Sequence, residues 1–156
     1  MKPFRFPLES LRVLRKQKEN VAQQHYADAL ADCGRAELHL QAAVAELTAG
    51  WDSLRHELVH GATAGEITGK RTGCLVLETR RDARKAALAE AHRAAEAAFQ
   101  EMLAAVRDRE ALDRFHDKSR RAHDREVQRA EQKNFDEMAV QSSGANSLLQ
   151  LAGHEN

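Results

Sequence analysis

Proline is confined to the first seven residues of this chain. Pro3 and Pro7 are the only two, and none occurs between residues 8 and 156. Proline removes a backbone donor and clashes with the preceding helical turn, so its absence leaves nearly the whole chain able to form uninterrupted helix. Charged residues make up 31% of the sequence and aromatic residues 4%, which leaves little for a globular core. The composition is typical of long helices or a coiled coil in one domain.

Apolar spacing predicts two long helices. Apolar and small residues recur every three or four positions over about 8–59 and, more loosely, over about 75–140. Between them, "HGATAGEITGKRTG" contains four of the eight glycines and predicts a turn over about 60–74. Residues 141–156 lose the period and are expected to form a flexible C-terminal tail. The expected fold is all-α: residues 1–140 form a long antiparallel two-helix coiled-coil hairpin with a glycine-rich turn. A monomer is expected, although the same stripes could pair between chains.

The expected turn also sets a register. If it centres near residue 67, the numbers of facing residues add to about 134, so Leu11 lies near His123 and both chain ends meet at one tip. Arg12, Arg15 and Lys16 then face residues 118–122.

Charge is distributed unevenly along the chain. Residues 1–20 carry six Lys or Arg against two acids, residues 114–133 carry seven against four, and residues 21–113 carry eleven against fifteen. The expected tip is therefore basic and the body acidic, although a solvated coiled-coil face explains any single charge equally well. Aromatics are not interleaved with the bases, so the pattern does not predict nucleic-acid binding.

Two segments resemble enzyme motifs. "HELVH" (56–60) matches the H-E-x-x-H zinc pattern, but a two-helix hairpin offers neither a third ligand nor a sheltered cleft. "GEITGKRTG" (65–73) lacks two residues of the phosphate-binding loop, since Ala64 and Arg71 stand where Gly and Ser or Thr are required. Cys33 and Cys74 have no metal-type spacing and are expected to be small buried hydrophobic residues. We therefore expect no catalytic residue, metal or cofactor.

The two ends of the chain resemble one family. "FRFPLESLRVLRKQKENVA" (4–22) places aromatic and leucine residues at the entry of a basic helix, and "EQKNFDEMAVQ" (131–141) runs a basic helix into an Asp-Glu-apolar-Ala sequence. Together with the length and the hairpin pattern, these segments are similar to those of the FliJ family of flagellar export proteins.

The resemblance implies a non-enzymatic role in flagellar protein export. Members of the FliJ family are antiparallel coiled coils similar to the central stalk of rotary ATPases. Their terminal tip enters the ring of the flagellar export ATPase and promotes its assembly, another surface contacts the cytoplasmic part of the membrane export gate, and members engage export chaperones. The implied location is the cytoplasm, peripheral to the inner face of the cell membrane through the export apparatus. The absence of an apolar run of about 20 residues agrees with no direct membrane insertion.

The resemblance and the basic tip together identify candidate site residues. For the ATPase ring they are Phe4, Phe6, Leu8, Leu11, Arg12, Arg15, Lys16, Arg121, Phe135, Asp136, Glu137 and Met138. For the export gate, near the start of the second helix, the candidates are Leu75 and Leu77.

Two alternatives remain open. An injectisome stalk or another cytoplasmic coiled-coil adaptor would show the same sequence physics, and a zinc hydrolase would use the HELVH match. Stimulation of a cognate ATPase separates the stalk from an adaptor, and metal analysis tests the hydrolase.

Overall fold

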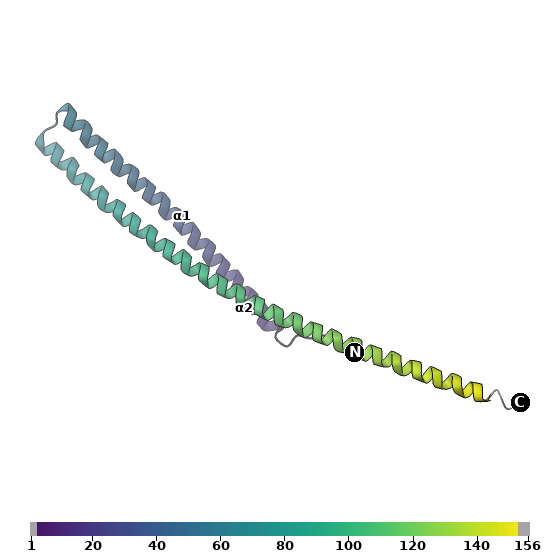
Figure 1. Cartoon of the computed structure of the whole chain (residues 1–156). Coiled ribbons are helices and arrows are strands. Elements are labelled where there is room, and N and C mark those ends of the chain that lie inside the picture. Colours follow the sequence, from purple (N-terminus) through teal and green to yellow (C-terminus); the bar gives the residue numbers. More distant parts are fainter. Residues whose placement is uncertain (1–2, 153–156) are drawn as a thin grey trace. The chain divides into compact units, whose positions relative to one another are not determined.

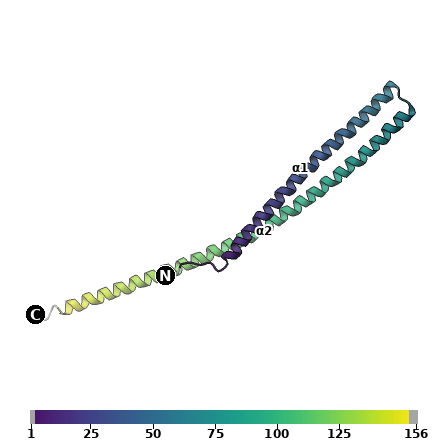
Figure 2. The same ribbon diagram turned by 180° about the vertical axis from the view of Figure 1, so that it is seen from behind.

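The computed structural model describes the backbone of residues 3–152 and the side chains of residues 3–140. Helix α1 spans Glu9–His60 and helix α2 spans Ala64–Ala152. The fold is all-α, with the two long helices packed against each other as a hairpin, which confirms the predicted class (Figures 1 and 2). Within the described residues, no helix is long and apolar enough to cross a membrane.

The chain divides into two compact units. The first, called the terminal unit here, combines Met1–Leu14 with Arg109–Asn156, and the second, the central unit, is Arg15–Asp108. In the central unit the two helices run side by side in opposite directions, joined by the turn (Figure 1).

The turn is much shorter than the sequence predicted. Only residues 61–63 separate the helices. Gly61 adopts φ 85° and its N–H donates to the carbonyl of Glu57 at 3.0 Å, which caps the end of α1 with a left-handed residue. The predicted glycine-rich turn over about 60–74, with a second helix beginning at about 75, is therefore wrong.

A capping box explains why α2 begins early. The backbone N–H and the hydroxyl of Thr63 each lie 2.8 Å from Glu66 Oε2, and the Glu66 N–H points back at Thr63 Oγ1 at 3.4 Å. This reciprocal arrangement satisfies donors that a helix start leaves unpaired. The hydrogen bonds from Thr63 also lower the pKa of the Glu66 carboxyl. Gly65, Gly69 and Gly73 consequently lie inside α2.

Cross-helix contacts fix the register. In the central unit the Tyr26 and Phe99 rings lie 5.3 Å apart, and Arg80 pairs with Glu46 at 2.9 Å. The numbers of such facing residues add to about 125, against the predicted sum of about 134. The predicted pairing is therefore displaced by about nine residues, because the turn centres near residue 62.

Small side chains form the core of the central unit. Ala29 and Cys33 of α1 pack with Ala95 and Ala98 of α2. Ala98 is only 1% exposed, and small residues of this kind allow the two helix axes to approach closely.

Gly50 extends this close packing toward the turn. A Cβ at Gly50 would lie 3.0 Å from Leu77 Cδ1 and 3.5 Å from Cys74 Sγ. Both cysteines are buried free thiols, as expected of small hydrophobic residues.

Helix α2 also continues further than expected. The sequence predicted a tail from residue 141, yet the backbone is helical through Ala152. No proline interrupts this stretch, so the helix can continue through its serines, Gly144 and Asn146, which are weaker helix formers than its Ala, Leu and Gln residues. Residues 153–156 lie outside the described residues.

Candidate binding surface of the terminal unit

The first residues of the chain lie along α2 through aromatic contacts. The Phe4 ring is 5.7 Å from His116 and 5.5 Å from His123. Phe6 lies 4.9 Å from His116 and 5.8 Å from Phe115. His116 and His123 are seven residues apart, so two helical turns of α2 present them on one face. The two N-terminal phenylalanines therefore hold the entry segment against α2.

An ion pair continues this attachment into α1. Arg12 Nε donates to Asp113 Oδ1 at 2.8 Å, and Arg109 reaches Asp113 Oδ2 at 2.6 Å. The hydrogen bond from Arg12, followed by that from Arg109, lowers the pKa of Asp113. The same bond raises the pKa of Arg12. Arg12 therefore contributes to the attachment of α1 to α2, because its guanidinium is already bonded to Asp113.

Apolar burial adds little to the attachment. Leu8 and Leu11 are each 37% exposed, and Phe115 is 49% exposed. Hydrophobic stabilisation is proportional to the area removed from water, so these side chains realise only part of their transfer free energy. Ring contacts and ion pairs therefore hold the entry segment against α2 more than buried apolar surface does.

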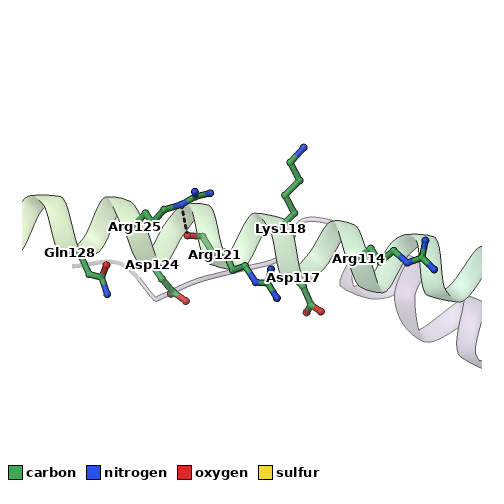
Figure 3. A pocket seen from close by; sticks show the side chains of 7 residues that line it. All are labelled: Arg114, Asp117, Lys118, Arg121, Asp124, Arg125 and Gln128. Atoms are coloured by element: carbon green, nitrogen blue, oxygen red, sulfur yellow. Dashed lines mark hydrogen bonds between the residues drawn. The ribbon is translucent and has the colours of Figure 1, made fainter.

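Four cations line one stretch of α2 beside the attached segment. Arg114, Lys118, Arg121 and Arg125 surround a shallow surface depression, together with Asp117, Asp124 and Gln128 (Figure 3).

The two carboxylates in this stretch already have neighbours. Asp117 lies 3.1 Å from His116 Nδ1, and Asp124 lies 3.7 Å from His123 Nδ1. In Figure 3 the Lys118 side chain extends away from the helix on the side opposite Asp117. The surface therefore presents exposed positive charge, within the stretch 114–133 where the sequence shows an excess of bases. Of its cations, only Arg121 was a predicted site residue.

Beyond this stretch α2 runs on as a single helix (Figure 2). All described side chains from Gln128 to Val140 are exposed, including Phe135 at 67% and Met138 at 65%. Asp136 accepts a hydrogen bond from Gln132 at 2.9 Å, and Glu137 lies 3.7 Å from the Lys133 ammonium. Among the described residues, both carboxylates therefore pair only with side chains of their own helix. The predicted candidates at the chain's end thus lie on an exposed helix.

The other basic candidates do not join this surface. Arg15 pairs with Asp108, and Lys16 lies 3.5 Å from Glu19, all within the central unit. The predicted placement of Arg12, Arg15 and Lys16 opposite residues 118–122 is therefore wrong. The physical reason is the register, which brings carboxylates of α2 to the arginines of α1.

The two candidates for the export gate lie in the central unit. Leu75 is 50% exposed, whereas Leu77 is half-buried beside Gly50. Val76, between them, is 57% exposed. This part of α2 thus presents apolar side chains to solvent, but Leu77 serves packing between the helices.

The HELVH segment forms the last turn of α1. The His56 and His60 rings stack with centroids 4.0 Å apart, and His60 Nδ1 lies 2.8 Å from the His56 carbonyl oxygen. In the part of the chain that the structure describes, no group of three or more His, Cys, Asp or Glu residues could hold a metal ion. The two histidines therefore contact each other and the backbone of their own helix end.

Comparison with known proteins identifies the family. The model of the family described as flagellar FliJ protein matches residues 4–147, which covers most of the chain. The chain belongs to the FliJ family. It is thus a non-enzymatic component of flagellar export, as the resemblance at its two ends predicted. No curated protein and no solved structure matches it.

Family membership bears on the surfaces described above. The match begins at Phe4 and includes the ring contacts, the cation stretch and the exposed end of α2. The sequence placed residues 114–133 in a basic tip but did not single out Lys118 or Arg125 as candidate site residues, although their spacing with Arg121 on one helix could have indicated them.

Proposed function

We propose that this chain is a stalk-like component that binds the ring of the flagellar export ATPase through its terminal unit. It promotes ring assembly and couples the ring to the cytoplasmic part of the membrane export gate, and it also engages export chaperones. It acts in the cytoplasm, at the inner face of the cell membrane, through the export apparatus.

One observation carries the proposal. Phe4 and Phe6 attach the entry segment to α2, and the exposed cations Lys118, Arg121 and Arg125 lie beside that attachment. A protein ring that surrounds a helix end contacts it from several sides, and complementary charges steer and orient such an encounter. The arrangement suits a ring whose inner surface is acidic or polar.

The exposed end of α2 supports the same role. Phe135 and Met138 are large apolar side chains left in water on a helix, where they add little to folding. Exposed aromatic and methionine side chains are enriched at protein interfaces. We infer that they, with Asp136 and Glu137, contribute to the same contact.

Charge reversal tests the proposal directly. In the double variant Lys118→Glu with Arg121→Glu, we expect co-sedimentation with the flagellar export ATPase to weaken by at least about tenfold, because two steering charges become repulsive. Exposed charges contribute little to folding, so circular dichroism should be unchanged. The matched control is Lys85→Glu with Arg107→Glu, two exposed cations of the central unit.

The control should bind and stimulate the ATPase as wild type does. If the Lys118 and Arg121 variant also behaves as wild type, with and without nucleotide, the terminal unit is not the contact. An equal loss in both variants would indicate a general charge effect, which also contradicts the proposal.

A further inference from the structure

The last turn of α1 contains two histidines that lie side by side. The sequence has eight histidines, and His56 and His60 are the one pair among them separated by three or four residues. Residues four apart are neighbours on a helix surface. The two imidazole rings lie with their centroids 4.0 Å apart and their planes at 18°, and both residues are exposed. A solute can therefore reach two adjacent imidazoles at this end of the helix.

The separation of the two rings suits a chelate. Zinc–nitrogen bonds are about 2.0–2.1 Å long, so two nitrogens bound to one tetrahedral ion lie roughly 3.3 Å apart. The ring centroids are only slightly further apart than this. The outer torsion of a histidine side chain is broad, so exposed rings can rotate to close the difference without strain.

A hydrogen bond already orients one of the rings. His60 Nδ1 lies 2.8 Å from the carbonyl oxygen of His56. A carbonyl oxygen only accepts, so Nδ1 carries the proton in this bond and Nε2 of the neutral ring keeps the lone pair that binds a metal. Histidines that bind metals usually donate their other N–H to a partner of this kind, which fixes the ring. The hydrogen bond is independent of the spacing and orients His60 as a metal ligand.

The position of the pair also favours a cation. His60 is the last residue of α1, and the carbonyl groups at a helix C-terminus carry partial negative charge. Glu57, the acid within the HELVH segment, pairs with Lys70 of α2. Among the described residues no third His, Cys, Asp or Glu joins the two histidines. A bound ion would thus have two nitrogen ligands from the chain and water in its other positions.

We propose that His56 and His60 bind one divalent transition-metal ion of the class of Zn²⁺ at the end of α1. Imidazole nitrogen suits zinc, copper and nickel, whereas calcium and magnesium prefer oxygen ligands. The catalytic H-E-x-x-H motif needs a third ligand and a cleft, but binding alone needs only the pair. The ion links the two ends of the last helical turn and stabilises α1 beside the turn at Gly61. It adds no catalytic step.

Calorimetric titration of the full chain with Zn²⁺ tests the proposal. After treatment with EDTA, wild type should show one saturable site per chain. His56→Asn and His60→Asn each remove one ligand and should weaken binding by at least about tenfold, the loss that even a change in an outer partner of a ligand can cause. The control His39→Asn with His92→Asn removes two exposed histidines that have no histidine one turn away, and should bind as wild type does.

Two calorimetric results would overturn the proposal. One is the absence of saturable binding up to about 1 mM Zn²⁺, where binding would be worth little. The other is binding that either single variant leaves unchanged, because a chelate needs both rings. Circular dichroism should be the same for all variants, since the replaced side chains are exposed.

Trp51 provides a test of where the ion binds. It is the only tryptophan of the chain and lies about 7.5 Å before His56 along the axis of α1. Cu²⁺ binds nitrogen ligands more tightly than Zn²⁺ and quenches tryptophan fluorescence at short range. We expect quenching in wild type and in the control, but not in the double variant His56→Asn with His60→Asn. Quenching that persists in the double variant contradicts the proposal.

Both experiments use the chain alone, so their outcome is separate from binding to the export ATPase.

Discussion

Replacing the helical glycines of α2 by alanine should stabilise the protein, although the sequence pattern assigned them to a turn. Gly65, Gly69 and Gly73 lie inside α2, and a Cβ at any of them would meet nothing within 4 Å. Glycine in a helix interior costs about 1 kcal/mol relative to alanine, because it loses more backbone freedom on folding. Alanine therefore brings the gain in helix propensity without a steric cost.

The magnitude follows from the position of each glycine. Gly69 and Gly73 lie well within the helix and should each contribute about 1 kcal/mol on replacement. Gly65 lies in the first turn beside the capping box, where fewer backbone bonds are formed, and should contribute less. The triple variant should gain about 2–3 kcal/mol, which for a chain of this size raises the Tm by roughly 4–12 °C.

Gly61 provides the matched control. A Cβ at Gly61 also meets nothing within 4 Å, but its φ is 85°, a conformation that L residues other than glycine rarely adopt. Gly61→Ala should therefore destabilise by about 1–2 kcal/mol. The same chemical change thus has opposite signs on the two sides of Thr63.

Thermal melts followed by circular dichroism measure the global effect, and amide hydrogen exchange over residues 64–76 measures the local one. If the segment is helical, exchange there should slow by up to about a hundredfold in the triple variant. A lower Tm, or unchanged exchange in that segment, would refute the helical assignment and restore the long turn.

Three further predictions concern the cap, the register and the close approach of the helices. Thr63→Ala should cost about 1 kcal/mol in chemical denaturation. Because the folded pKa of Glu66 is lowered, its contribution is present above its unfolded pKa of about 4.3 and lost as pH falls through the folded value, so wild type and Glu66→Gln should converge in acid melts. Arg12→Asp should speed hydrogen exchange in residues 3–14, and adding Asp113→Arg should restore protection; the register expected from the sequence would instead place the new carboxylate among cations. Gly50→Val should destabilise by about 1–3 kcal/mol through contact with Leu77 and Cys74, seen in thermal melts.

The sequence was sufficient for the fold class and insufficient for its register. The two features that predicted the helices are the absence of proline after Pro7 and the helical spacing of apolar residues. Both act on local backbone conformation, so they can be read from the sequence itself. The turn depended on a competition between three glycines and a capping box at Thr63. The capping box and the cooperativity of a long helix outweighed the cost of about 1 kcal/mol for each glycine placed inside the helix.

An error in the turn is doubled in the register. Moving the centre of a hairpin turn by five residues changes the sum of facing residue numbers by ten, and here the centre moved from about 67 to about 62. The correct register was hard to detect from the sequence because the packed residues, such as Ala29, Cys33 and Ala95, are small and alanine is frequent on every face of the helices. Steric complementarity between two particular helices selects the register, and a single sequence does not display it.

The corrected register changes which charges can serve a partner. The register predicted from the sequence added Arg12 and Arg15 to the cations near residue 121, but the two arginines lie against Asp113 and Asp108. A partner would have to break those ion pairs before it could use either arginine, and that cost reduces any gain in binding. Among the described residues no ion pair engages Lys118 or Arg121, so these two cations of α2 carry no such cost, whereas Arg114 pairs with Glu110 at 3.2 Å and Lys133 with Glu137 at 3.7 Å. The binding role proposed for the terminal unit therefore rests mainly on α2. The entry segment contributes by packing Phe4 and Phe6 against that helix.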